Sequence, residues 1–355
     1  MCQGAALAEP RKGWTTGACA AAAAKAAATA LVRGRFPKRV TIALPKGLTP
    51  SFAPTKTRLG KGWAEAGVIK DAGDDPDVTH GALILVRVRK AQPGSGLVWK
   101  AGQGVGTVTL PGLPIAVGEP AITPGPRAQI ARNLQGLGED WEITLSIPGG
   151  AELAKTTLNG RLGIKGGLSI LGTTGVVMPY SNAAWIHSIH RAIDVARAGD
   201  LAHIAACTGD ASERGVARLH RLPARALIDV GGFMGPLFKY LSSRQGRIAR
   251  LTLAGGFAKM SKLAQGALDL HSSKAAIDAE FLADCLARLG AAKAVVAKAR
   301  ASESAARILV LAGRHPLALA IAKQAKAVAK AYLPPTTKVD VALFDRAGQL
   351  LAHAD

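Results

Sequence analysis

The second half of the chain repeats one local pattern three times: a short apolar strand, a turn that contains glycine, and a helix. The strands are expected over residues 201–206, 226–230 and 248–254, and the helices over residues 211–219, 236–243 and 257–267. A helix between two strands returns the chain to the same edge of a sheet, so successive strands run parallel. The pattern therefore predicts an α/β Rossmann-like domain with a mainly parallel sheet.

Ligands of such open sheets bind beyond the carboxyl ends of the strands. The cofactor-binding candidates at these ends are Gly209, Asp210, Asp229, Gly231, Gly232, Gly235, Gly255 and Gly256. Their carboxylates are available to ribose hydroxyls, whereas the glycines either admit a nucleotide-like ligand or merely let the turns close. No Asp or Glu ends the strand after Gly235, where a dinucleotide fold would hold the ribose. This disfavours a nicotinamide dehydrogenase and leaves open a nucleoside without pyrophosphate, such as S-adenosylmethionine.

In the first half, the expected strands and helices do not follow a regular βαβ alternation, which predicts an α+β domain. An alanine-rich helix is expected to start near Thr15 and to run through residue 30. Further strands are expected over residues 39–44, 82–88, 107–110 and 141–147, and a helix over residues 126–134. A chain of 355 residues is long enough for two domains. We place their boundary in the glycine-rich stretch near residue 160, giving domains 1–160 and 161–355.

Four aspartates crowd into seven residues of the first half, at Asp71, Asp74, Asp75 and Asp77. Such carboxylates repel one another unless water, backbone N–H groups or a cation absorbs their charge. Pro76 makes this run a shaped loop and excludes a helix. The loop is either a surface turn whose Asp side chains bond their own backbone, or a rigid acidic loop held by the strand that follows.

Two further places favour an anion. The start of the first helix exposes N–H groups and a positive dipole beside Lys12, and Lys259 and Lys262 share one face of a later helix. The substrate-binding candidates are Lys12, Thr15, Thr16, Gly17, Lys259, Lys262 and His271. A buried helix start and ordinary solvated lysines are the alternatives. Cys19, in the first helical turn, is either an activated thiolate or a buried inert thiol.

The chain carries 45 Lys and Arg against 24 Asp and Glu, a formal charge of +21. A positive charge of this size attracts nucleic acid, an anionic membrane or a polyanionic small substrate. The basic residues are dispersed and aromatic residues make up only 4%, which argues against a nucleic-acid arm or a stacking platform.

The cysteines and histidines predict no protein-bound metal. Cys2, Cys19, Cys207 and Cys285 are far apart without C-x-x-C spacing, and His271 has no second ligand nearby in sequence. The first ten residues lack the pattern of a secretory signal, and no stretch of about 18 apolar residues suggests a membrane span. We therefore expect a cytoplasmic protein with no membrane partner; the sequence leaves the oligomeric state open.

Several motifs resemble the cobalt-precorrin-5B C(1)-methyltransferase family, in order along nearly the whole chain. They lie at residues 13–23, 70–79, 112–122, 146–150, 161–164 with Gly167, 169–175, 262–266 and His271-Ser272. The acidic loop is the most specific of them. The chain departs from the family pattern at Thr123, where Asn is usual, and at Ala258, where Gly is usual.

The resemblance implies methyl transfer from S-adenosylmethionine to C-1 of cobalt-precorrin-5B, giving cobalt-precorrin-6A in anaerobic cobalamin biosynthesis. It also implies a polyanionic cobalt-corrinoid partner, no nucleic acid, and cobalt that arrives inside the substrate. An Asp of the acidic loop would offset the sulfonium charge or act as base, so Asp71, Asp74, Asp75 and Asp77 are the catalytic candidates. A nucleic-acid-binding protein and a nicotinamide-dependent reductase of a polyanionic substrate are the alternative functions.

Overall fold

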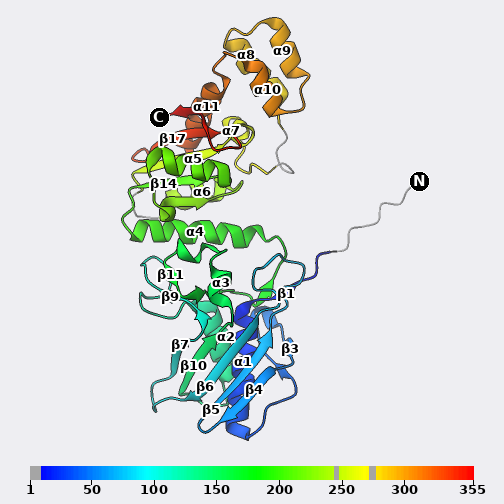
Figure 1. Ribbon diagram of the computed structural model, residues 1–355, viewed down its shortest axis with the longest axis vertical. Coiled ribbons are helices and arrows are strands. Elements are labelled where there is room, and N and C mark those ends of the chain that lie inside the picture. Colours follow the sequence, from blue (N-terminus) through cyan, green and yellow to red (C-terminus); the bar gives the residue numbers. More distant parts are fainter. Residues whose placement is uncertain (1–8, 244–247, 272–276) are drawn as a thin grey trace, which may run out of the picture. The chain divides into compact units, whose positions relative to one another are not determined.

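The computed structural model describes residues 9–243, 248–271 and 277–355, and the chain forms two compact units, Met1–Ser181 and Asn182–Asp355 (Figure 1). The division therefore follows residue 181, whereas the sequence placed the boundary near residue 160. The physical reason is strand pairing, because three short strands after residue 160 pair back to strands of the first unit. These pairs are β11 (Ile164–Lys165) with β9 (Thr107–Val108), β12 (Gly167–Leu168) with β8 (Gly104–Val105), and β13 (Val176–Val177) with β1 (Gly13–Trp14).

The first unit is built on a five-stranded sheet of order β4-β5-β6-β10-β7. Its strands are β4 (Thr55–Gly60), β5 (Trp63–Ile69), β6 (Leu83–Lys90), β10 (Trp141–Ser146) and β7 (Leu97–Ala101). Neighbours run antiparallel except for the β10–β7 pair, which is parallel. In β10 buried and half-buried residues alternate, so one face of the strand faces the core.

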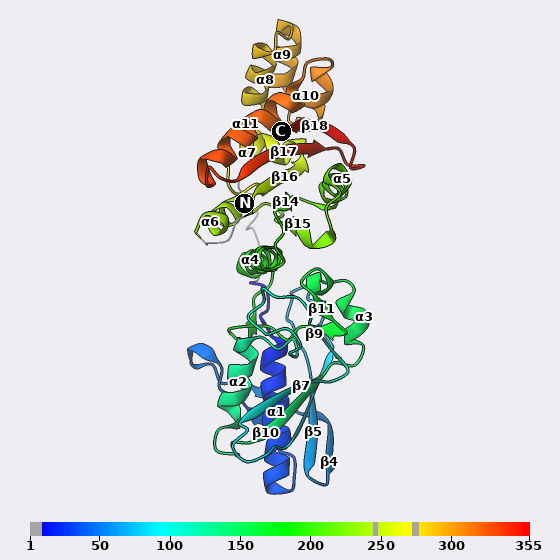
Figure 2. The same ribbon diagram turned by 90° about the vertical axis from the view of Figure 1, so that its left-hand side faces the viewer.

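Helix α1 (Thr16–Arg33) fills the core of this unit. Alanine favours the helix, and the Thr15 side chain caps it by accepting from the Ala18 N–H at 3.2 Å. The small side chains let α1 pack closely on β5 and β6, with α2 (Pro124–Leu134) beside it (Figure 2). Eleven of its residues from Ala18 to Ala30 have no exposed surface, so the predicted helix is a buried one.

The sequence misjudged the length of one strand and missed several others. The strand expected over residues 39–44 shortens to β2 (Val40–Thr41), paired with β3 (Ser51–Phe52), and Pro45 opens a turn of 3-10 helix, η1 (Pro45–Gly47). The β4–β5 hairpin and β7 had not been expected. A short helix α3 (Gly150–Ala154) and the turn η2 (Leu158–Gly160) complete the unit.

The second unit is built on a five-stranded sheet of order β15-β14-β16-β17-β18. Its strands are β15 (Leu227–Asp229), β14 (His203–Cys207), β16 (Arg250–Gly256), β17 (Lys338–Phe344) and β18 (Leu350–Ala354). The first four run parallel and β18 pairs antiparallel to β17. The sheet is therefore mixed, with an antiparallel edge strand that the sequence pattern did not indicate.

Helices cover both faces of this sheet. Helix α5 (Asp210–His220) packs on one face against Ala205, Cys207 and Ala254. The opposite face, with Ile204 and Leu253, packs against α4 (Asn182–Ala198), α6 (Met234–Ser243), α7 (Phe257–Ala264) and α11 (Leu317–Tyr332). Between α7 and α11 the chain forms a small group of helices, α8 (Ala279–Arg288), α9 (Lys293–Arg300) and α10 (Ala305–Ala312) (Figure 1). The 3-10 turn η3 (Ala224–Ala226) precedes β15. The sequence pattern also predicts a helix over residues 276–290, of which residue 276 lies outside the described residues and α8 forms the central part.

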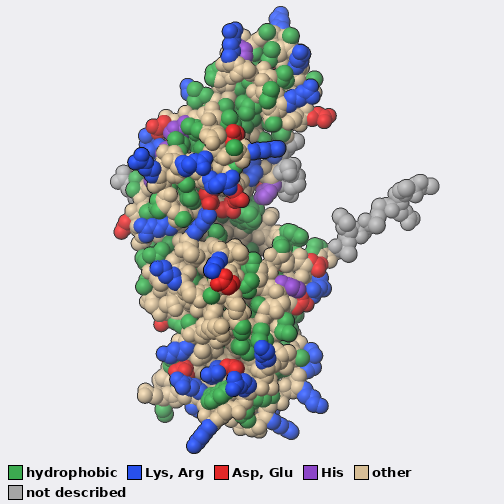
Figure 3. Space-filling model, viewed as in Figure 1, with side chains coloured by type: hydrophobic (Ala, Val, Ile, Leu, Met, Phe, Trp, Pro, Cys, Tyr) green, Lys and Arg blue, Asp and Glu red, His purple; other side chains and the backbone are tan. Residues whose placement is uncertain are grey.

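Two surface properties bear on function. On the face drawn in Figure 3, Lys and Arg side chains are dispersed over both units with acidic groups among them. Within the described residues, none of the helices combines the length and apolar character that a membrane crossing requires.

Candidate functional site

The connections of the C-terminal sheet define where a ligand can approach. From β14 the chain passes through α5 to β15 on one side, and then through α6 to β16 on the other side of β14. Where successive connections turn to opposite sides, the loops after the two central strands diverge and leave a crevice at the carboxyl ends. The loops that begin at Thr208, after β14, and at Gly256, the last residue of β16, flank this point.

Lys259, in the first turn of α7, ties these loops together. Its ammonium donates to the carbonyl oxygen of Thr208 at 2.5 Å and to that of Gly231 at 3.3 Å. Burial is the main cause of the lowered pKa of this half-buried lysine. A cation bound to two strand-end carbonyls holds the loops after β14 and β15 in one arrangement.

Asp229 ends β15 beside this lysine. Its carboxylate accepts from the Gly231 N–H at 3.1 Å, and burial raises its pKa. The indole of Trp185, on α4, donates to the Asp229 carbonyl at 3.3 Å, and its ring lies tilted to that of Phe233 with 6.4 Å between the centroids. Gly231 has φ of 55°, and a Cβ there would lie 3.2 Å from the Trp185 ring, so a glycine suits this turn. The result is a carboxylate next to an aromatic surface that is 45% exposed at Trp185.

Two glycines of the site border open space. Among the described residues, a Cβ on Gly209 would meet no atom within 4 Å, and one on Gly256 would meet only the Phe344 carbonyl at 4.0 Å. Asp210 is exposed at the first position of α5. Gly255 is different, because a Cβ there would lie 2.7 Å from the Thr208 hydroxyl. Gly255 therefore serves packing, while Gly209, Asp210 and Gly256 line the open side.

The remaining C-terminal candidates support the loops. Lys262 is 7% exposed and donates to the Leu270 carbonyl at 3.3 Å, so its ammonium faces the protein. The Gly232 carbonyl accepts from the Leu270 N–H, and the Gly235 N–H donates to the Leu268 carbonyl. His271 is exposed and its ring packs on Phe233 at 4.9 Å. Ser272 of the same motif lies outside the described residues, as does Cys2.

In the N-terminal unit the acidic loop binds the segment that precedes α1. Arg11 forms two hydrogen bonds to Asp71, at 2.5 and 2.9 Å, and its backbone N–H donates to Asp74 at 2.6 Å. The hydrogen bond from Arg11 lowers the pKa of Asp71 to about 2. Gly73, with φ of 70°, lies against the Arg11 carbonyl, where a Cβ would not fit. The first two aspartates thus fasten the loop to residue 11.

The other two aspartates also have partners in the chain. Asp75 accepts from the Tyr180 N–H at 3.0 Å. Asp77 pairs with Lys70 at 2.5 Å and accepts from the Thr79 N–H and hydroxyl. Burial alone would raise the pKa of Asp77, but the hydrogen bonds of Lys70 and Thr79 lower it. The Asp71 and Asp74 side chains are 48% and 55% exposed, against 25% for Asp77.

The start of α1 is largely enclosed. Thr15, Thr16 and Gly17 are buried, and a Cβ on Gly17 would lie 2.8 Å from Pro126, whereas Lys12 is exposed. Cys19 has no exposed surface, and burial raises its pKa to about 12. Cys19 is therefore the buried thiol of the two alternatives, and Lys12 alone among these candidates reaches solvent.

The structure thus gathers Gly209, Asp210, Asp229, Gly231, Gly256 and Lys259 at one edge of the C-terminal sheet, and Lys12 with the acidic loop in the N-terminal unit. Sequence reasoning missed Trp185, because it lies 44 residues from its partner Asp229. An exposed tryptophan at the start of an amphipathic helix was its only sequence signal. Nothing in the local spacing related it to the glycine turn.

Comparisons with known proteins cover both units. The family model CbiD matches residues 4–179, and the model "CbiD, C-terminal domain" matches residues 269–355. The chain is 53% identical over 351 residues to the cobalt-precorrin-5B C(1)-methyltransferase of Paramagnetospirillum magneticum, covering 97% of this chain and 98% of that one. It is 55% identical over 347 residues to the enzyme of the same name from Rhodospirillum rubrum, covering 97% of each. The crystal structure of the cobalamin biosynthesis protein cbiD from Archaeoglobus fulgidus aligns with a TM-score of 0.40 and 27% identity, over 75% of this chain and 83% of that one.

Proposed function

The chain belongs to the cobalt-precorrin-5B C(1)-methyltransferase family, and we propose that it methylates C-1 of cobalt-precorrin-5B to cobalt-precorrin-6A with S-adenosylmethionine as donor. The donor supplies an electrophilic methyl group on a sulfonium. The carbon that receives it belongs to an electron-rich macrocycle, so the reaction requires no activated Ser or Cys. The protein therefore contributes to catalysis by aligning the reactants and excluding water.

We propose that the C-terminal sheet acts as a Rossmann-like donor site. The observation that carries this proposal is the Lys259 bridge between the Thr208 and Gly231 carbonyls, beside Asp210 and Asp229. Hydroxyl groups of a ribose are hydrogen-bond donors that suit these carboxylates. The open space at Gly209 and Gly256 and the apolar surface of Trp185 suit a nucleoside. The residues present therefore fit the donor.

The positive charge of the chain supports a substrate that carries several carboxylates. A corrin precursor carries several acetate and propionate carboxylates, for which a chain of formal charge +21 is a favourable partner. Lys12, at the exposed edge of the first unit, is the N-terminal candidate for one of these carboxylates. The proposed catalytic group is the acidic loop, with Asp74 as its most exposed member.

Cobalt enters with the substrate in this proposal, so methyl transfer itself uses no protein-bound metal. We further propose a cytoplasmic location, as expected of a biosynthetic enzyme whose cysteines Cys19 and Cys285 are free thiols. The nucleic-acid alternative gains no support from the dispersed basic side chains of Figure 3.

The function is tested by anaerobic incubation with cobalt-precorrin-5B and S-adenosylmethionine that is isotopically labelled in the methyl group. Mass spectrometry of the corrinoid should show the gain of one labelled methyl. A reaction without donor and one with heat-denatured protein are the controls. An unchanged corrinoid in the presence of intact folded protein would refute the proposal.

A further inference from the structure

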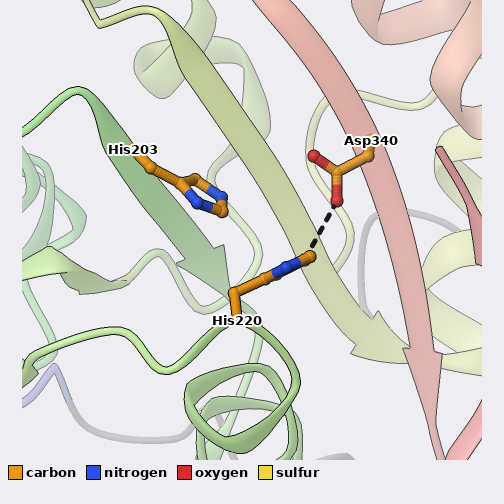
Figure 4. A group of neighbouring side chains, drawn as sticks. All are labelled: His203, His220 and Asp340. Atoms are coloured by element: carbon orange, nitrogen blue, oxygen red, sulfur yellow. Dashed lines mark hydrogen bonds and ion pairs between the residues drawn. The ribbon is translucent and has the colours of Figure 1, made fainter.

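A second cluster of polar side chains lies at the amino ends of the parallel strands. His203 is the first residue of β14, Asp340 is the third residue of β17, and His220 is the last residue of α5 (Figure 4). Helix α5 begins at Asp210, beside the proposed donor site, and runs back across the sheet to His220. The cluster is therefore separate from the donor site by the length of the strands.

Asp340 is the centre of this cluster and has no exposed surface. Its Oδ2 lies 3.2 Å from His220 Nε2 and 2.9 Å from His353 Nε2, while Arg250 Nε donates to Oδ1 at 2.8 Å. The Thr252 hydroxyl donates to the same carboxylate, at 2.9 and 3.0 Å, and lies 2.7 Å from His203 Nε2. Two imidazoles thus contact this buried carboxylate directly, and the third, His203, is linked to it through Thr252.

We propose that His203, His220 and Asp340 form a binding site for one divalent first-row transition metal ion of the Zn²⁺ type. One ligand atom from each residue lies within 4.8 Å of the other two. In a tetrahedral zinc site with bonds of about 2.0 to 2.1 Å, ligand atoms are about 3.3 Å apart. The Asp340–His220 pair already has this spacing at 3.2 Å, so His203 is the ligand that moves inward from Thr252.

The surroundings of the three residues suit an outer shell for an ion. Arg250 binds Oδ1 of Asp340, so Oδ2 is the oxygen that faces the histidines. Arg250 also forms an ion pair with Asp355 at 3.5 Å, which offsets part of the guanidinium charge. Thr252 and His353 orient the carboxylate by hydrogen bonds. Second-shell partners of this kind fix the direction of metal ligands and tune their affinity.

Burial and hydrogen bonds shift the pKa values of all three residues. Burial lowers the pKa of His203 to about 4, and burial also lowers the pKa of His220. Burial alone would raise the pKa of Asp340, but hydrogen bonds from Arg250, His353 and Thr252 bring it to about 2. At neutral pH the site therefore offers two neutral imidazoles and one carboxylate, the forms that bind a metal. A neutral imidazole carries one proton, which can sit on either ring nitrogen. Each histidine can therefore bind a metal ion through Nε2 without releasing a proton to solvent.

An ion here would join the end of α5 to the amino ends of β14 and β17. This site goes beyond the methyl transfer reaction, and it revises the expectation from the sequence that the chain binds no metal. The three residues are up to 137 positions apart, so no local ligand spacing was visible.

The test uses the full chain, stripped with a chelator, dialysed and titrated with ZnCl₂. Calorimetry and elemental analysis should give one tightly bound Zn²⁺ per chain, and CoCl₂ should give the visible absorption of a tetrahedral N/O site. The variant His203→Gln should weaken Zn²⁺ binding at least about tenfold. The matched control is His187→Gln on α4, an exposed histidine whose ring lies 6.3 Å from that of His190, and this variant should bind Zn²⁺ as the wild type does.

Three results would overturn the proposal: no Zn²⁺ retained by the wild type, wild-type affinity in His203→Gln, or a loss confined to His187→Gln. After either of the first two results, the cluster would be only a hydrogen-bonded support of β17. The third result would place the ion at the α4 histidines. If His203→Gln does not fold, the Co²⁺ spectrum of the wild type still decides, because an octahedral aquo spectrum excludes the site.

Discussion

At Asp71, Asp74, Asp75 and Asp77, one short loop combines two kinds of carboxylate. Asp77 is paired with Lys70, whose side chain is only 1% exposed. Asp74 and Asp75 accept hydrogen bonds from backbone N–H groups of Arg11 and Tyr180 and neutralise no buried cation. Substitution should therefore separate a residue that holds the fold from residues that are open to substrate.

Asp77→Asn should destabilise the protein by about 3 kcal/mol, because it leaves the Lys70 ammonium buried without its counter-charge. The free energy of unfolding from urea titrations measures this loss. Asp74→Asn is the matched control, since its carboxylate is half exposed, and it should cost less than about 1 kcal/mol. Equal losses in the two variants would contradict the assignment of Asp77 as the structural member.

Asp74→Asn combined with Asp75→Asn should lower methyl transfer far more than it lowers thermal stability, if the acidic loop acts on the reacting groups. An activity loss of about 100-fold with a melting temperature close to that of the wild type is expected, in line with general acid–base groups. The measurement is the initial rate of label transfer beside a thermal melt. Parallel losses in rate and stability would remove the loop from catalysis.

At the scale of elements, Lys259 connects α7 to the ends of β14 and β15. Lys259→Met keeps the length of the side chain but removes its hydrogen bonds to the Thr208 and Gly231 carbonyls. The variant should bind S-adenosylmethionine about tenfold more weakly, since the loops lose their fixed arrangement. Lys298→Met on α9, an exposed lysine of the same unit, is the control for loss of charge. Unchanged donor affinity in Lys259→Met would contradict the bridging role.

The histidine cluster at the other end of the sheet predicts a pH effect. His203 has a pKa of about 4 in the folded chain against 6.5 ordinarily, so the unfolded chain binds more protons between these values. Stability is therefore lost as pH falls from about 6.5 toward 4, by on the order of 2 kcal/mol from this group. In chelator-treated protein, the melting temperature of the wild type should drop more between pH 7.5 and pH 4.5 than that of His203→Gln. An equal drop would show that His203 is not held neutral by the fold.

Sequence patterns captured the elements whose cause is local. The alanine run of α1 and the strand–glycine–helix repeats of β14, β15 and β16 follow from propensity, capping and turn chemistry, and the structure has them within a few residues. The antiparallel strand β18 and the return of residues 164–177 to the first unit depend on pairing partners far along the chain. No local signal specifies such partners, so neither the division after residue 181 nor the antiparallel edge strand of the mainly parallel sheet was foreseeable.

The same distinction holds for the sites. The positions of Gly209, Asp210, Asp229 and Gly256 at strand ends were predictable, because the residues follow apolar strands directly in the sequence, and their binding of a ligand stays a prediction. Whether Lys262 and Cys19 can reach a ligand depends on their burial, which the sequence does not specify. Both carry reactive groups but are enclosed in the fold. His203, His220 and Asp340 converge only when β14, α5 and β17 are assembled.

For the molecule as a whole, we propose that the methyl donor binds at the carboxyl ends of the C-terminal sheet. Calorimetric titration of S-adenosylmethionine into Gly256→Leu tests it most directly. Gly256 has an ordinary extended conformation, with φ of −75°, and borders open space, so the added side chain fills the proposed site with little strain. Gly160→Leu is the matched control, because among the described residues its Cβ would meet no atom within 4 Å and Gly160 lies in the other unit. Gly256→Leu should keep the wild-type melting temperature and lose donor binding, whereas Gly160→Leu should keep both. Wild-type donor affinity in Gly256→Leu would exclude this location of the donor.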